Sequence, residues 1–423
     1  MKKTTVWAAI ALTMMATATT GCSLDNNDDR EEPRFVICTL EPLTPTDLTL
    51  GELELVNHSN EFAFNLFRTA QDGKKSQILS PISITYALGM LNNGACGETQ
   101  EQINKVLGFG SVGADSINIF CYKMLQIAPA LDPLTKVMIA NNIYVNKDYE
   151  LKQGFMEKAN VFYNAKPETR DFHDGKTMNV INQWSSDHTE QMITEVLDED
   201  SFNPDVVSYL LNAIYFKGSW TSKFDKAKTV DEDFQTPQEG DISDIKPLPM
   251  MHQLATFDYG ETADYQALRL PYGNGSFVMT LLLPKTKTNK VPEIPTAEAW
   301  QQLNQRMYGH EVDVKLPRFE TTTNLNLKDI MSVLGMPNAF DYLKADFSNF
   351  CNTPTFIGLM KQVAKIKLDE EGTEAAAVTV IGMDNGEMVD EPILTFHANH
   401  PFLYVISEKQ TGAIFFIGQF TGC

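Results

Sequence analysis

The segment that most constrains the fold of this chain runs from Gly372 to Val389 and contains no proline. It follows a strand-like run at Val363–Leu368, and its first ten residues are small or β-branched apart from Glu374. In an extended chain alternate side chains point to the same side. One of the two sets is uncharged and consists of Thr373, Ala375, Ala377, Thr379 and Ile381. The segment can therefore enter a sheet as a buried strand. The alternative is an ordinary surface loop or edge strand, which does not explain so long a proline-free run.

Helices are expected mainly in the first half of the chain and strands mainly in the second. Helical periodicity, or a capping signal such as Ser80-Pro81, marks the ranges 57–70, 80–93, 98–107 and 178–197. Strand-like runs occupy 137–145, 207–217, 277–283, 311–316 and 363–368, and a hairpin is expected from 402–406 and 413–420. No repeat or linker interrupts the chain from Asn57 to Cys423. The pattern predicts one α+β domain over residues 57–423.

The N-terminus has the pattern of an export signal over residues 1–21. Two lysines precede a short apolar run that ends at Gly21-Cys22 and is too short to span a bilayer. A small residue directly before a cysteine here resembles the cleavage box of bacterial lipoproteins, so Cys22 is the expected lipidation site. The alternative is an ordinary signal peptide with a chance cysteine. Residues 22–56 begin with an acidic stretch and predict a disordered tether. We expect an exported protein, held by this lipid at the outer membrane or cell surface, or otherwise secreted.

The charge and the cysteines exclude several classes of partner. A formal net charge of −21 makes nucleic acid a poor partner. The cysteines other than Cys22 are Cys38, Cys96, Cys121, Cys351 and Cys423. Because there are five of them, at least one is unpaired, and no two have metal-type spacing. We expect no metal and no cofactor, and a fold held together by its apolar core rather than by disulfides.

No catalytic motif stands out. The sequence 108–113 matches G-x-G-x-x-G, but a helix is expected before it and Gly108 suits the end of that helix, so a glycine-rich turn is the better interpretation. His397 and His400 are three apart in an extended stretch and would point to opposite faces, so they cannot share a metal. Neither a nucleophile elbow nor a phosphate loop occurs. An enzyme is not expected; the alternative is a hydrolase, which would need a Ser/His/Asp set dispersed along the sequence.

Several motifs, in order along the chain, resemble the serpin family of protease inhibitors. Residues 365–377, Lys-Ile-Lys-Leu-Asp-Glu-Glu-Gly-Thr-Glu-Ala-Ala-Ala, are similar to a serpin strand followed by the hinge of the reactive loop. Further matches are Leu79-Ser80-Pro81-Ile82-Ser83-Ile84, residues 211–220, Pro249-Met250-Met251, Leu316-Pro317-Arg318-Phe319, residues 399–404 and the C-terminal strand. The resemblance implies the serpin fold, an α+β fold of about nine helices packed on three β-sheets with an exposed reactive loop, here about 370–395.

The resemblance also implies a mechanism and its hinge. A serpin is cleaved by its target protease as a suicide substrate, and its loop then inserts into a sheet while the protease is still bound as a covalent acyl-enzyme. The hinge residues carried over are Glu370, Glu371, Gly372, Thr373, Glu374, Ala375, Ala376 and Ala377. The partner would be a target protease, the membrane would be reached only through the N-terminal lipid, and a monomer is expected. The alternative within the family is a non-inhibitory serpin that acts as a binding module.

Two regions that control sheet opening in serpins are carried over by motif. Ser80, Ser83 and Asn212 match polar positions beneath the opening sheet, called the shutter. Gln362 stands where many serpins have a shutter histidine, and glutamine can donate and accept hydrogen bonds but does not titrate. Trp220 matches the breach, where insertion begins.

The scissile bond is left open between three candidates. Counting from the hinge glycine gives Gly386-Glu387, whereas side-chain chemistry favours Met388-Val389, and Met383-Asp384 is the third. No lysine or arginine lies between Lys367 and Lys409, so trypsin-like proteases are poor targets. Elastase-like, chymotrypsin-like or subtilisin-like proteases are expected instead, with papain-like cysteine proteases as a further option.

Overall fold

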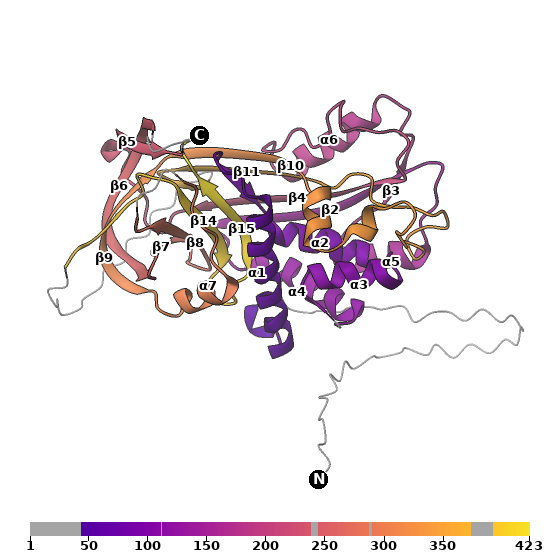
Figure 1. The fold of residues 1–423 in the computed structure, drawn as a ribbon, viewed down its shortest axis with the longest axis horizontal. Helices are drawn as coiled ribbons and strands as arrows, with labels where there is room; N and C mark the ends of the chain where they lie inside the picture. Colours follow the sequence, from indigo (N-terminus) through magenta and orange to yellow (C-terminus); the bar gives the residue numbers. More distant parts are fainter. Residues whose placement is uncertain (1–43, 111, 238–243, 287–289, 374–391) are drawn as a thin grey trace, which may run out of the picture. The chain divides into compact units, whose positions relative to one another are not determined.

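A computed structural model describes residues 44–110, 112–237, 244–286, 290–373 and 392–423. The chain divides into two units: Met1–Cys38, which lies outside the described residues, and the compact unit Thr39–Cys423. Every described helix and strand belongs to this compact unit, which is drawn in Figure 1.

The described residues contain eight α-helices, most of them in the first half of the chain. These are α1 (Leu50–Ala70), α2 (Pro81–Asn92), α3 (Gly97–Val106), α4 (Ala114–Ala130), α5 (Gln153–Tyr163), α6 (Thr177–His188), α7 (Ala297–Asn304) and α8 (Lys328–Leu334). Three short 3-10 helices are η1 (Pro45–Asp47), η2 (Lys226–Lys228) and η3 (Pro337–Phe340).

Most of the strands lie in the second half of the chain, as expected. They are β1 (Gln77–Leu79), β2 (Thr135–Asn146), β3 (Glu168–Arg170), β4 (Ser208–Ser219), β5 (Val230–Thr236), β6 (Asp244–Glu261), β7 (Tyr265–Tyr272), β8 (Phe277–Pro284), β9 (Tyr308–Pro317), β10 (Phe319–Asn326), β11 (Lys361–Asp369), β12 (Gly372–Thr373), β13 (Leu394–His397), β14 (Phe402–Glu408) and β15 (Ile414–Phe420).

These strands form two hydrogen-bonded sheets within the described residues. The smaller has the order β10-β11-β12-β4-β2-β3, and the larger has the order β1-β15-β14-β8-β7-β6-β9-β13, with β5 paired to β6. The long strand β6 pairs with β7 at one end and with β5 and β9 elsewhere, so it joins two parts of the larger sheet. If the larger sheet is counted as two sheets that share β6, the structure has three sheets, which matches the expected three-sheet α+β fold.

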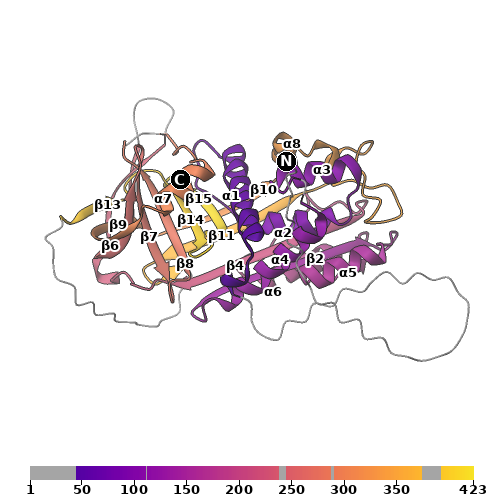
Figure 2. The same ribbon diagram turned by 90° about the horizontal axis from the view of Figure 1, so that it is seen from below.

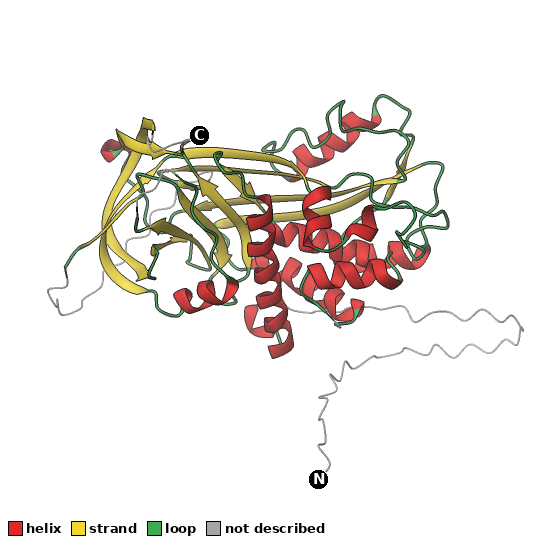
Figure 3. Ribbon diagram, viewed as in Figure 1, coloured by secondary structure: helices red, strands yellow, loops and turns green. Residues whose placement is uncertain are grey.

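Helices cover both faces of the six-stranded sheet. In Figure 1, α2 and α4 lie below β2 and β4, whereas α6 lies above the same strands. Figure 2 shows the strands β6, β7, β9 and β13 gathered at the end away from α3 and α5. The colouring by secondary structure in Figure 3 makes the same division between a helix-rich and a strand-rich end visible. The six-stranded sheet therefore forms a layer between helices that pack on its two faces.

The first long helix begins earlier than the sequence pattern suggested. We expected a helix over 57–70 and a tether over 22–56, but α1 starts at Leu50 and residues 44–56 are folded. The cause is a capping box: the Glu52 backbone N–H donates to the Thr49 hydroxyl at 3.2 Å, and the Glu52 carboxylate accepts from the Thr49 N–H at 2.7 Å. The tether prediction is therefore wrong for these last residues.

Helix α6 ends earlier than expected, at His188 rather than near Leu197. The Asn182 side chain accepts hydrogen bonds from the backbone N–H groups of Val196 and Leu197 and donates to the carbonyl of Leu197. It thereby turns the following segment back onto the helix. Glu190 and Gln191 take left-handed backbone conformations in this turn, which no continuing helix would need.

The described residues of the glycine-rich sequence 108–113 do not have the setting of a nucleotide-binding turn. Helix α3, not a strand, precedes it, and Gly108 has a φ of +75° just past the end of that helix. A Cβ added at Gly108 would lie 3.1 Å from the Cβ of His58. The expected helix-ending turn is confirmed.

Gly218 on β4 lies against Tyr272 on β7, so a substitution at Gly218 tests how tightly the two sheets pack there. A Cβ there would lie 2.8 Å from the ring of Tyr272, so Gly218→Ala should destabilise the fold by about 1–3 kcal/mol through overpacking. Gly154→Ala in α5 is the control, because nothing lies within 4 Å of its Cβ. The midpoint of urea unfolding should fall for the first variant only. Equal midpoints would contradict the packing described here.

Candidate functional site

The turn between β11 and β12 marks one end of the candidate site. Gly372 has a φ of +148°, and a Cβ there would lie 2.1 Å from the carbonyl oxygen of Gly218. Only glycine fits such a position. The next residue, Thr373, pairs with Leu368 on β11 and with Gly218 on β4. The two residues of β12 are thus already seated between β11 and β4.

Thr373 faces inward, as the alternation predicted. Its side chain is only 2% exposed, and its hydroxyl lies 2.7 Å from the Tyr272 hydroxyl. The other residues of the expected inward set, together with the hinge residues Glu374, Ala375, Ala376 and Ala377, lie outside the described residues. So do the scissile candidates Met383, Gly386, Glu387, Met388 and Val389, and the lipidation candidate Cys22.

Trp220, the residue expected to mark the breach, contacts the turn between β11 and β12. Its indole N–H donates to the carbonyl of Asp369 at 2.9 Å, and its backbone N–H donates to the carbonyl of Glu371 at 2.8 Å. The indole stacks on Tyr272 with ring centroids 4.4 Å apart and planes 16° from parallel. The turn, the tryptophan and the tyrosine form one packed unit.

Two glutamates of the hinge are tied to cations. Glu370 is buried, accepts from the Thr229 hydroxyl at 2.8 Å and lies 3.4 Å from the Arg318 guanidinium. Glu371 lies 2.7 Å from the ammonium of Lys223 and 3.1 Å from that of Lys226. Hydrogen bonds from these two lysines hold the pKa of Glu371 below its ordinary value.

The predicted shutter residues Ser80, Ser83 and Gln362 meet beneath the sheet. The Gln362 amide nitrogen donates to the Ser80 carbonyl at 2.9 Å and to the Ser83 hydroxyl at 2.8 Å. Its amide oxygen accepts from the Ser80 backbone N–H at 3.1 Å. Glutamine therefore uses both of its functions here. The Ser80 hydroxyl does not cap α2, as its N-cap position suggested, but donates to the Phe415 carbonyl at 2.8 Å.

Asn212, the fourth shutter candidate, bonds elsewhere. Its amide nitrogen donates to the Asn141 side chain on β2 at 2.8 Å. Its amide oxygen is buried and has no hydrogen-bond partner within the described residues. Asn212 and Gln362 line one cavity, but their side-chain hydrogen bonds go to different partners.

A cavity of about 490 Å³ lies between the halves of β4 and β11 that β12 does not reach. Within the described chain β4 pairs on its other edge with β2, and β11 pairs with β10. The cavity wall carries apolar side chains, among them Ile84, Leu88, Leu91, Leu210, Phe347 and Phe350, and polar or charged ones that include Asn212, Gln362, Asp205 and Lys361. Among the described strands none pairs with these halves of β4 and β11 across the cavity, so its position suits an added extended segment.

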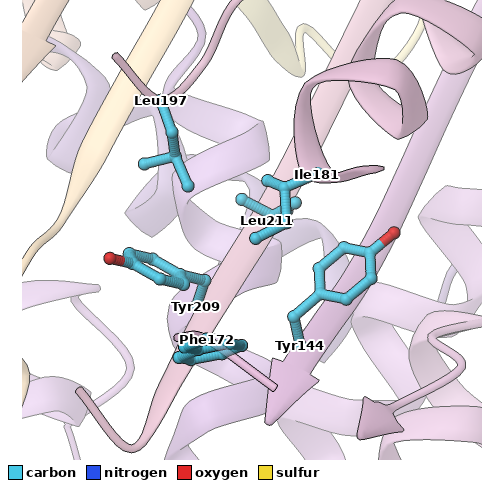
Figure 4. Packing of buried hydrophobic residues seen from close by; sticks show 6 residues of the cluster. All are labelled: Tyr144, Phe172, Ile181, Leu197, Tyr209 and Leu211. Atoms are coloured by element: carbon cyan, nitrogen blue, oxygen red, sulfur yellow. The ribbon is translucent and has the colours of Figure 1, made fainter. Parts of the chain in front are cut away.

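The far end of β11 is tied to the segment that follows α6. The Lys361 ammonium lies 3.1 Å from the Asp198 carboxylate and 3.4 Å from the Ser201 hydroxyl. Hydrogen bonds from Ser201 and Lys361 lower the pKa of Asp198 to about 2. Leu359, just before β11, packs against a buried cluster that joins α6 to β2 and β4. Figure 4 shows six residues of that cluster, including Ile181 and Leu211.

His397 and His400, which are three residues apart in the chain, contact different groups. His397 contacts the Asp313 carboxylate at 2.9 Å, and His400 contacts the Pro284 carbonyl at 2.9 Å. Across the residues that the structure describes, no group of three His, Cys, Asp or Glu side chains could hold a metal ion. In the same residues no helix combines the length and apolar character needed to cross a membrane.

Several residues of the site were not predicted. Tyr272, Lys223, Lys226, Thr229, Asp198 and Lys361 support the hinge and the gap but belong to no motif. Arg318 lies in the motif Leu316–Phe319, which drew attention to the segment but not to its partner Glu370. The sequence alone could not identify the cations that pair with the two hinge glutamates, because the chain contains 34 lysines and arginines.

Comparisons with known proteins agree on one family. The family model described as serpin (serine protease inhibitor) matches residues 57–423. Human serpin B3 is 32% identical over 390 residues, which cover 86% of this chain and 98% of that protein. An uncharacterised serpin-like protein of Thermococcus kodakarensis is 31% identical over 403 residues, covering 93% and 92% of the two chains.

Solved structures give the same result. The native state of the thermophilic serpin tengpin superimposes with a TM-score of 0.78 at 25% identity, covering 90% of this chain and 96% of that one. Native protease nexin-1, crystallised with heparin, gives a TM-score of 0.75 at 26% identity, with 88% and 99% covered. Together with the seated hinge and the gap beside it, these matches show that the chain belongs to the serpin family.

Proposed function

We propose that this protein inhibits serine-type endopeptidases as a suicide substrate, by inserting its reactive loop between β4 and β11. The observation that carries the proposal is β12, since Gly372 and Thr373 already pair with both strands. A strand begun in this way can be extended by adding residues to its end. The cavity of about 490 Å³ beyond it supplies the space.

The proposed reaction begins as ordinary proteolysis. The serine hydroxyl of the protease attacks the scissile carbonyl of the loop, the peptide bond breaks and the new amine leaves with a proton. The N-terminal part of the loop stays bound as an ester, the acyl-enzyme. Insertion then competes with hydrolysis of that ester. When insertion comes first, the protease is dragged away from the loop's starting position and its active site is distorted.

The energy for this movement would come from the inserted strand. About ten new backbone pairs at roughly 0.5–1.5 kcal/mol each amount to something on the order of 10 kcal/mol. This is comparable to the stability of a whole domain. The uncut protein would therefore be kinetically trapped rather than in its most stable state.

The residues beneath the gap would control its opening. Gln362 on β11 is bonded to Ser80 and Ser83 at the start of α2, so any movement of β11 must carry or break these bonds. Glutamine does not titrate, so we infer that this control point is insensitive to pH, unlike a histidine in its place.

The target is proposed from the loop sequence. The absence of lysine and arginine between Lys367 and Lys409 argues against trypsin-like proteases. Methionine and small residues at Met383, Gly386 and Met388 suit elastase-like, chymotrypsin-like or subtilisin-like pockets, or a papain-like cysteine protease. We further propose that Cys22 carries a lipid that anchors the protein at the outer membrane or cell surface.

Inhibition can be tested directly with subtilisin and pancreatic elastase, using trypsin as the control. We expect an SDS-stable covalent complex with at least one of the first two and none with trypsin. Loop-cleaved protein should unfold roughly 10–20 °C higher than uncut protein, because the inserted strand adds stability. Absence of both the complex and the thermal shift would contradict inhibition and favour a non-inhibitory binding module. Mass spectrometry of the cleaved loop would locate the scissile bond.

A matched pair of substitutions tests the direction of the inserted side chains. Because Thr373 faces inward, a continuous inserted strand would place Ala377 on the inward side and Ala376 on the outward side. Ala377→Glu would bury an unpaired charge and should convert the protein from inhibitor to substrate. Ala376→Glu should leave the number of inhibitor molecules consumed per protease unchanged. If both variants inhibit equally well, the proposed insertion register is wrong.

The lipid anchor is tested by fractionating cells that express the full chain. Cys22→Ala should move the protein from the membrane to the soluble fraction, because the acyl chains can no longer be attached. Cys38→Ala is the matched control and should stay in the membrane fraction. Continued membrane association of the Cys22 variant would rule out the lipoprotein assignment.

A further inference from the structure

The hydroxyl of Tyr272 is held at a fixed point beneath the hinge. Its ring is fully buried, which raises the pKa of the phenol well above its ordinary value. The ring stacks on Trp220 and meets Phe216 edge-on at 5.0 Å. Gly218 leaves no spare room on a third side, since even a Cβ would come within 2.8 Å of the ring. The phenol therefore cannot move together with β12 if that strand shifts.

The partner of this hydroxyl is the first inward residue of the reactive loop. Thr373 is 2% exposed, and its hydroxyl lies 2.7 Å from that of Tyr272. Two buried hydroxyls so placed satisfy each other, and separating them would cost this buried hydrogen bond. Tyr272 comes from β7 of the larger sheet, whereas Thr373 belongs to the smaller one. The bond therefore ties the loop to a sheet that takes no part in insertion.

Among neighbouring registers of β12, only the observed one allows this hydrogen bond to form. A shift of β12 by one residue would turn Thr373 to the opposite face of the sheet. A shift of two residues out of the gap would place Ala375 over the phenol, and alanine has no hydroxyl, whereas a shift of two residues deeper would bring the charged Glu371 there. In each case the buried Tyr272 hydroxyl would lose its partner Thr373, which is unfavourable.

We propose that Tyr272 is a positioning residue, which keeps Thr373 seated between β4 and β11 and sets the register in which the loop inserts. The inference rests on the proposed function for its consequence, but the seating itself is a property of the uncut protein. Insertion can propagate only from molecules in which β12 is seated. If β12 is unseated in most molecules, the rate of insertion falls in proportion to the fraction of molecules in which it is seated. Hydrolysis of the acyl-enzyme then competes more successfully with insertion.

Two isosteric variants remove the bond from either side. Tyr272→Phe and Thr373→Val each delete a hydroxyl and keep the shape of the side chain, while Thr373→Ser keeps the hydroxyl and serves as control. In the uncut protein, mass spectrometry should show hydrogen exchange in a peptide covering 368–373 about tenfold faster in the first two variants, the effect expected for one buried hydrogen bond. Exchange as slow as in the wild type in both variants would overturn the proposal without reference to any protease.

The coupling to inhibition is measured as inhibitor molecules consumed per molecule of subtilisin inactivated. Each hydroxyl deletion should raise this ratio, and the double variant should raise it no further than the stronger single one, because both remove the same bond. Thr373→Ser should resemble the wild type. A merely structural role would instead lower the urea midpoint and leave the ratio unchanged, which would overturn the proposal.

The two proposals fail in different ways. If the wild type neither traps protease nor gains thermal stability on loop cleavage, the inhibitory function fails, and with it the role of Tyr272 in insertion. If the wild type does both and the two deletions leave the ratio unchanged, only the positioning role fails.

Discussion

The two-residue strand β12 is the constraint on which the rest of the site depends. It bridges β11 and β4 at one end, and beyond it those strands face each other across a cavity rather than across a ladder of hydrogen bonds. Within the described residues, no strand bridges β4 and β11 beyond β12, and a strand added there would gain backbone hydrogen bonds on both sides. In the proposed mechanism the loop would make these bonds by completing the strand that β12 begins.

The gap separates two blocks of the six-stranded sheet that are held together at a few points. One block is β4-β2-β3 with α6 packed on it, and the other is β10-β11. They are tied at one end by the hinge and at the other by the Lys361–Asp198 ion pair, while Gln362 ties β11 to α2 below. The Lys361–Asp198 and Gln362 ties are polar and local, whereas Leu359 adds an apolar contact with the cluster on α6, β2 and β4. Such an arrangement suits a sheet that has to open.

Much of the fold could be predicted from the chain, because periodicity and capping are local. Helix α2, the strands β2, β4, β8 and β11, and the final hairpin lie where expected, and Thr373 faces inward as its parity required. Start and end points failed where one side chain decided them, as Glu52 and Asn182 did for α1 and α6. Tyr272 and Arg318 could not be assigned, because their partners lie 101 and 52 residues away and no spacing encodes such contacts.

The contacts at the hinge divide into an outer and an inner set that respond to different conditions. Glu371 with its two lysines is partly exposed, and such ion pairs are weak and screened by salt. The Tyr272–Thr373 hydroxyl pair is neutral and fully buried, so neither salt nor pH near neutrality affects it directly. The ion-paired glutamates lie at the turn, and Thr373, the residue that enters the sheet, is neutral. The hinge can therefore be anchored electrostatically at its outer side without placing these charges on the inward face of the strand, where they would have to be desolvated.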